Sequence, residues 1–104
     1  MPRSKRLPRA EFRAAGYRAE RTPFFSLKMK TNKAGGPRIG VIVGKSVHKT
    51  AVRRNFWKRQ ARSVLQSLVS GERDVILIMQ PQANAMTKKK FREALAQVIT
   101  KITR

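Results

Sequence analysis

The spacing of apolar residues changes along the chain, and each change predicts a new element. In FFSLKMK, residues 24–30, Phe25, Leu27 and Met29 alternate with polar residues, which is the period of a half-buried strand. RIGVIVGK, residues 38–45, is a second and more apolar strand. The polar stretch between them holds two Gly and a Pro, so we expect a hairpin loop there.

The longest periodic segment predicts an amphipathic helix over residues 51–69. Thr50 is a suitable N-terminal cap, and Gly71 is suited to the turn that follows the helix. Apolar residues recur at positions i, i+4, i+7, i+8 and i+11, which puts them on one face. The stripe that this helix should bury consists of Trp57, Ala61, Val64, Leu65 and Leu68.

Three further segments complete the pattern. DVILIM, residues 74–79, is a continuous apolar run, typical of a central strand covered on both faces. A last amphipathic helix is predicted after Thr87, and a short first helix is predicted over residues 8–15, before Gly16. The order helix, two or three strands, helix, strand, helix predicts a two-layer α/β sandwich with a mixed sheet. A chain of 104 residues is enough for one domain, spanning 1–104.

The charge of the chain narrows the choice of partner. The chain has 25 Lys and Arg residues but only five acidic residues, which gives a net charge of +20. Such a charge favours a polyanionic partner, and nucleic acid is a better candidate than a membrane surface. No apolar run approaches the roughly 20 residues that span a bilayer. The chain has no Cys, which excludes a disulfide framework and a thiolate zinc site. No apolar core of a secretory signal is present, and we expect a cytoplasmic location.

The segment TAVRRNFWKRQAR, residues 50–62, places four Arg and one Lys around a single Asn, without any acid. A solvated helix face normally mixes signs, because opposite charges at i and i+4 stabilise a helix. The uniform charge therefore indicates phosphate contact. A helix-turn-helix would need a short helix directly upstream, where this chain has a strand, so RNA is preferred to DNA. The expected RNA-binding residues are Lys45, Lys49, Arg53, Arg54, Asn55, Lys58, Arg59 and Arg62.

The two neighbouring rings in this segment receive different interpretations. Trp57 lies on the apolar stripe, so core packing is preferred to base stacking. Phe56 projects away from the stripe, and either covers a second packed element or presents its ring to RNA. His48 is the only imidazole of the chain and is interpreted as a loop or RNA-facing residue rather than a catalytic base.

Catalytic residues are not expected in this chain. A nuclease that acts alone needs a carboxylate cluster for divalent metal or a His-centred acid and base. The sequence also lacks a GxxxxGK[ST] loop and a GxGxxG motif after a strand. The acids are scattered, at Glu11, Glu20, Glu72, Asp74 and Glu93.

The segment AVRRNFWKRQAR, preceded by the strand RIGVIVGK, resembles the signature of the bacterial ribonuclease P protein component. The resemblance covers nearly the whole chain, including the PFFSL and DVILI strands and the closing amphipathic helix. Within the signature, Phe56 stands where the family has its second Arg, and Trp57 stands where an aliphatic residue is usual. The matching positions are Arg54, Asn55, Lys58 and Arg59.

This resemblance implies a function in the 5′ maturation of tRNA. It implies an α/β sandwich with a left-handed crossover, which binds a catalytic RNA through the signature helix and the 5′ leader of precursor tRNA in a cleft on the sheet. Catalysis would belong to the RNA and its Mg²⁺, with no cofactor bound by the protein and no obligate protein partner. The implied leader contacts are Phe12 and Lys28, the latter where the family has an aromatic residue. The alternative is a small basic ribosomal protein that binds rRNA, from which only the signature separates this chain.

Overall fold

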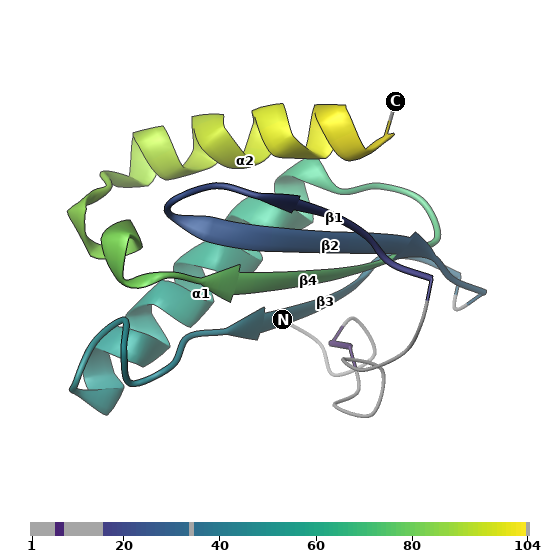
Figure 1. Cartoon of the computed structure of the whole chain (residues 1–104). Helices are drawn as coiled ribbons and strands as arrows, with labels where there is room; N and C mark the ends of the chain where they lie inside the picture. Colours follow the sequence, from purple (N-terminus) through teal and green to yellow (C-terminus); the bar gives the residue numbers. More distant parts are fainter. Residues whose placement is uncertain (1–5, 8–15, 34, 104) are drawn as a thin grey trace.

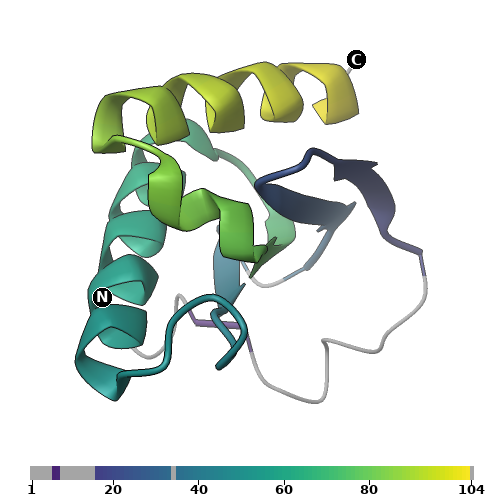
Figure 2. The same ribbon diagram turned by 60° about the vertical axis from the view of Figure 1, so that its left-hand side comes forward.

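The computed structural model describes residues 6–7, 16–33 and 35–103, which form a four-stranded sheet and two helices. The first predicted helix, over residues 8–15, lies outside the described residues. In Figures 1 and 2, α1 and α2 cover the same face of the sheet. The elements are β1 (Arg18–Arg21), β2 (Phe25–Thr31), β3 (Arg38–Ile42), α1 (Ala51–Leu68), β4 (Arg73–Met79), the short 3-10 helix η3 (Pro81–Ala85) and α2 (Lys88–Thr103).

The sheet is mixed and has the order β1-β2-β4-β3. β4 runs antiparallel to β2 and parallel to β3, which confirms that the apolar run of residues 74–79 is a central strand. In Figure 1, β3 and β4 both point left, α1 lies behind the sheet and β4 lies above β3. This arrangement makes the β3-α1-β4 connection left-handed, against the strong general preference for right-handed crossovers.

The prediction of a hairpin between residues 24–30 and 38–45 is wrong. β4 lies between β2 and β3, so these two strands do not pair and their connection passes across the end of β4. β4 has neighbours on both sides because its backbone is buried with its apolar side chains, and buried backbone groups require hydrogen bonds. The hairpin is instead formed by β1 and β2, where Thr22 Oγ1 accepts hydrogen bonds from the backbone N–H of Phe24 and Phe25.

The core lies between the sheet and the two helices. Four of the five residues of the predicted α1 stripe are buried, and Leu68 packs against the core from its rim. The ring of Phe91 on α2 meets the ring of Trp57 edge to face, with 5.7 Å between centroids, and meets Phe25 on β2 at 5.9 Å. This aromatic cluster joins both helices to the sheet. Over the described ranges, neither helix is long and apolar enough to cross a bilayer.

The helix ends follow the predicted caps. Thr50 Oγ1 accepts a hydrogen bond from Arg53 N at 3.3 Å, and Thr87 Oγ1 accepts one from Lys90 N at 3.2 Å. α1 ends at Leu68, one residue earlier than predicted, because Val69 already has an extended backbone. Gly71 then turns the chain into β4 with a φ of 80°, a conformation that glycine adopts without steric strain.

The one buried charged side chain among the described residues is Asp74, and it joins β4 to the β2–β3 connection. Arg38 donates to it twice, from Nε and Nη2, at 2.8 Å each. Asn32 Nδ2 donates to the same carboxylate at 2.7 Å and to Gly36 O at 3.1 Å. Burial acts to raise the pKa of Asp74, but the hydrogen bonds from Arg38 and Asn32 outweigh it and leave the pKa lowered.

We expect this ion pair to make the fold sensitive to acid. Because the folded-state pKa of Asp74 is lowered, its contribution is present above the unfolded pKa of about 3.9 and is lost as pH falls through the folded value. Asp74→Asn should cost about 1.5–3 kcal/mol at neutral pH, since it removes charged hydrogen bonds. Urea unfolding at pH 7 and pH 3 measures this, and the cost should shrink at pH 3. An equal cost at both pH values would mean that the charge of Asp74 is not what stabilises the fold.

Candidate nucleic-acid interface

The loop before α1 is fixed by the first turn of the helix. Arg54 Nη1 donates to the backbone carbonyls of His48 at 2.9 Å and Lys49 at 2.8 Å. The backbone N–H of Thr50 donates to His48 Nδ1 at 3.3 Å. This confirms His48 as a loop residue. The bonds hold Lys49 beside the first turn of α1, so the helix and its preceding loop form one cationic surface.

The outer face of α1 carries positive charge that no residue of the helix itself compensates. Arg53, Asn55 and Arg59 are exposed on it, and none of the 18 residues of the helix is acidic. The first turn also lacks an acid, although the positive end of the helix dipole would favour one there. An anion from outside the chain would therefore be stabilised by both the side chains and the helix start.

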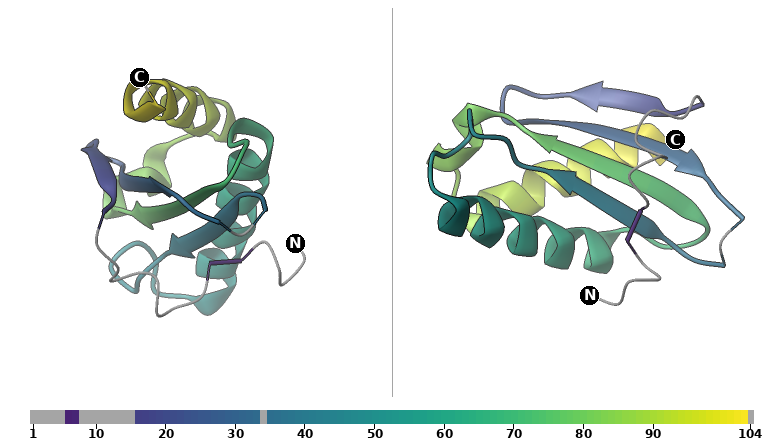
Figure 3. Two further views of the ribbon diagram at one scale, coloured as in Figure 1. Left: turned by 90° about the vertical axis from the view of Figure 1, so that its right-hand side faces the viewer. Right: turned by 90° about the horizontal axis from the view of Figure 1, so that it is seen from below.

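A second part of this surface lies between α1 and the outer edge of β3. Lys58 and Arg62 from α1 and Arg6 from the N-terminal segment line a hollow of about 440 Å³ beside residues 39–43. Leu7 N donates to Ile39 O at 3.0 Å, which holds the N-terminal segment against the edge strand. The right panel of Figure 3 shows α1 running alongside β3.

Arg62 is the most constrained cation of this hollow. Its Nε is buried and has no hydrogen-bond partner within the described part of the chain. Burial, together with the nearby charge of Arg6, lowers the pKa of the Arg62 guanidinium. The guanidinium still stays charged at neutral pH, because the ordinary pKa of an arginine lies far above neutrality. Buried N–H groups in native proteins nearly always have an acceptor, so an oxyanion in this hollow would complete the site.

The residues expected to bind RNA therefore fall into two groups. Lys58 and Arg62 are half-buried beside the β3 edge, and half-buried Arg54 is engaged with the loop carbonyls. The exposed group consists of Lys45, Lys49, Arg53, Asn55 and Arg59. Sequence reasoning did not identify Arg6 as a member, because only the pairing of residues 6–7 with β3 brings it to α1.

The two expected leader contacts have different outcomes. Phe12 lies outside the described residues. Lys28 is half-buried on the sheet face opposite the helices, where it pairs in register with Ile76. It lines a hollow of about 470 Å³ together with Arg21, Ser26 and Gln80. A groove with cationic and polar walls thus exists on the sheet face opposite the helices.

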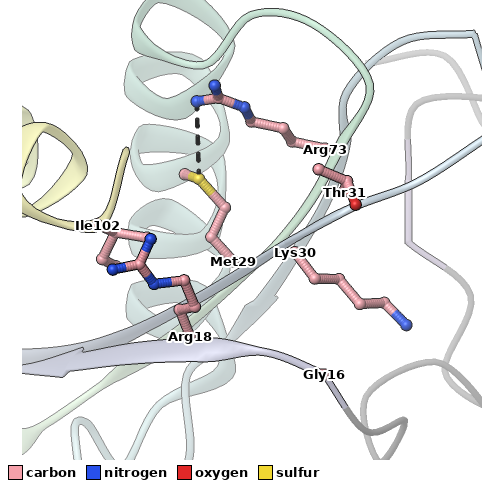
Figure 4. Close-up of a pocket in the computed structure, with 7 residues that line it drawn as sticks. All are labelled: Gly16, Arg18, Met29, Lys30, Thr31, Arg73 and Ile102. Atoms are coloured by element: carbon pink, nitrogen blue, oxygen red, sulfur yellow. Dashed lines mark hydrogen bonds between the residues drawn. The ribbon is translucent and has the colours of Figure 1, made fainter. Parts of the chain in front are cut away.

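Another basic hollow, of about 290 Å³, lies at the opposite end of the sheet and was not foreseen from the sequence. Figure 4 shows Arg18 reaching toward Ile102 and Arg73 reaching toward Met29, whose Sδ accepts a hydrogen bond at 3.9 Å. Arg18 lines this hollow together with Ile102 in the last turn of α2, where the free carbonyls of a helix end favour a cation. The three strands that contribute to it, β1, β2 and β4, meet only through the sheet register, so no local motif reveals this hollow.

The fold and the cationic face of α1 define a small RNA-binding protein of the mixed α/β class. The Ribonuclease P family model matches residues 1–103. The chain belongs to the ribonuclease P protein family, and the alternative of a ribosomal protein is not favoured.

Relatives and solved structures agree with this assignment. The chain is 37% identical over 93 residues to the ribonuclease P protein component of Ralstonia pickettii, a match that covers 81% of this chain and 66% of that protein, a little under two thirds. With the Pseudanabaena component the identity is 33% over 97 residues, covering 89% of this chain and 84% of that protein.

Among solved structures, Staphylococcus aureus RNase P protein superposes with a TM-score of 0.79 at 26% identity, covering 96% of this chain and 98% of that one. RNase P protein from Thermotoga maritima has the same fold, with a TM-score of 0.70 at 19% identity and coverage of 83% and 84%.

Proposed function

We propose that this chain binds a catalytic RNA through the cationic face of α1 and assists that RNA in removing the 5′ leader of precursor tRNA. The observation that carries the proposal is the set of three cations around one hollow, where the buried Nε of Arg62 has no acceptor among the residues that the structure describes. A backbone phosphate would accept from Arg62 and relieve its repulsion with Arg6. Membership of the ribonuclease P family supports RNA as the source of that phosphate.

The chemical step is assigned to the RNA and its Mg²⁺ rather than to side chains of this protein. Mg²⁺ is held by carboxylates, water and phosphates. Over the described residues, no three His, Cys, Asp or Glu side chains lie close enough together to hold a metal ion. Asp74 is already engaged by Arg38 and Asn32. These observations support a protein that supplies binding and positioning while the partner RNA supplies the metal site.

The groove that Lys28 lines on the sheet face opposite the helices is the proposed leader site. It is about 470 Å³ in volume and presents Arg21, Lys28 and Gln80 to one strand of nucleic acid. It lies on the face that the helices leave open, so the leader and the catalytic RNA would meet different surfaces of the same domain. We keep Phe12 as a candidate stacking residue for this site.

The partners are the catalytic RNA and precursor tRNA, and no protein partner or membrane is required. The location would be the cytoplasm, where precursor tRNA is processed. The net charge of +20 supports a complex in which RNA neutralises most of the surface.

Cleavage of precursor tRNA tests this function. The purified protein alone should leave the precursor intact, and addition of the RNA that co-purifies with it, together with Mg²⁺, should release the 5′ leader. The gain from the protein should be largest at low Mg²⁺, where its cations replace counterions. Sustained cleavage by RNA-free protein, or no stimulation of any co-purifying RNA, would contradict the proposal.

A matched pair of variants separates the α1 surface from charge in general. Arg59→Ala with Arg62→Ala should weaken binding of the catalytic RNA and leave the melting temperature unchanged, because neither residue packs in the core. Lys33→Ala with Lys101→Ala removes the same charge from two exposed positions away from α1. Equal losses from the two pairs would show that total charge, rather than this surface, sets the affinity.

A further inference from the structure

Phe56 is an exposed aromatic residue within the cationic face of α1. Its exposed fraction is 37%, whereas that of the neighbouring Trp57 is 5%. The Phe56 ring meets the Trp57 ring edge to face, with 5.9 Å between centroids and 78° between planes. The guanidinium carbon of Arg53 lies 5.4 Å from the Phe56 centroid. The ring is therefore anchored on the core side by Trp57 and has a cation on its solvent side.

The Phe56 ring lies outside the buried core. Trp57 and Phe91 belong to the buried core, and Phe56 meets that core through its edge-to-face contact with Trp57. One turn earlier on the same side of α1, Val52 is 75% exposed. Val52 and Phe56 thus form an apolar strip among the exposed residues Arg53, Asn55 and Arg59.

We propose that Phe56 and Arg53 form a stacking platform for an unpaired base of the bound RNA. The inference rests on the proposed function and adds a contact to a base where the surrounding residues would contact phosphates. An aromatic ring and a guanidinium plane both stack on nucleobases, and every base has a face to offer. A base held on Phe56 would keep its own phosphates within reach of the cations at positions 53 and 59.

Charge decides between RNA and a protein as the occupant of this strip. A protein segment docking on Phe56 would need an apolar centre and many acidic groups at its rim to match the surrounding cations. A single-stranded RNA has both properties in every nucleotide, with an apolar base face and an anionic phosphate. The platform would also supply affinity that does not depend on counterion release, unlike the contacts of Arg59 and Arg62.

The inference is tested with two polymers of equal charge, an oligoadenylate of about ten nucleotides and an abasic ribose-phosphate chain of the same length. The unaltered protein should bind the oligoadenylate about fivefold or more tightly than the abasic chain. Phe56→Ala and Phe56→Leu should lose most of this preference without a change in the salt dependence of binding. Leu keeps apolar cover over Trp57, so it separates stacking from packing. Val52→Ala is the matched control and should keep the preference.

The outcomes of this experiment test the stacking platform and not the proposed function. Phe56 variants that retain the full preference for bases would overturn the platform. Equal losses for both polymers, with a flatter salt dependence, would also overturn it, because the ring would then serve only to position Arg53. Phe56→Arg should steepen the salt dependence by about 0.7 in log–log slope while the base preference falls. Failure of the unaltered protein to bind either polymer would also overturn the platform, whereas the proposed function is tested separately by cleavage of precursor tRNA.

Discussion

Trp57→Ala should lower the free energy of unfolding by about 3–5 kcal/mol, which is the usual cost of deleting a large buried ring. Trp57 is 5% exposed. Its ring projects from α1 and contacts the ring of Phe91 on α2. Its loss would leave a cavity at the junction of both helices with the sheet. Domains of this size are held together by about 5–15 kcal/mol, so the variant should melt well below the unaltered protein in a thermal or urea titration.

Two further substitutions make this prediction specific. Trp57→Phe should cost much less, because it keeps the ring contacts and removes an indole N–H that has no acceptor within the described residues. Val52→Ala, at a position 75% exposed on the same helix, should change stability by less than about 0.5 kcal/mol. If Trp57→Ala melted normally and lost only RNA affinity, the buried and binding faces of α1 would be reversed.

Local periodicity was sufficient to predict most elements of the fold. The apolar stripe of α1 fixed which face is buried, because a helical repeat over 18 residues leaves only one continuous apolar side. The caps at Thr50 and Thr87 were also predictable, since an N-cap hydroxyl acts on a backbone N–H three residues away. Residues 74–79 were correctly predicted as a central strand, because an unbroken apolar run requires neighbours on both sides.

Strand order was not predictable from these local signals. The Gly- and Pro-containing stretch after β2 has the composition of a hairpin loop, yet it connects two strands separated by β4. Turn composition reports that the chain reverses direction, but not which strand pairs with it afterwards. The left-handed crossover also contradicts the general rule for parallel strands and entered only through the family resemblance.

The candidate site was predictable where it depends on one segment and unpredictable where it depends on several. The cationic face of α1 follows from the sequence of residues 50–62 alone. Arg6 reaches Arg62 only because residues 6–7 pair with β3, and the engagement of Arg54 with loop carbonyls requires the actual path of residues 48–49. Contacts between segments that are distant along the chain carry no local pattern, so sequence reasoning had no access to them.

The affinity of the protein for its RNA should fall steeply with salt. Each neutralised phosphate releases counterions and contributes roughly −0.7 to −0.9 to the slope of log K against log salt. With about five phosphate contacts, a fourfold rise in salt from about 50 to 200 mM should weaken binding by about 100- to 500-fold. Fluorescence anisotropy of a labelled RNA over this range measures the slope directly.

The same titration reports how many of the α1 cations contact phosphate. If Arg59 and Arg62 each contact one phosphate, Arg59→Ala with Arg62→Ala should reduce the magnitude of the slope by about 1.4–1.8. Arg54→Gln should change the slope less, because its guanidinium already donates to the carbonyls of His48 and Lys49. A nearly flat salt dependence of the unaltered protein would mean that apolar contacts dominate. That result would contradict a phosphate-binding role for the α1 surface, even though the chain carries a net charge of +20.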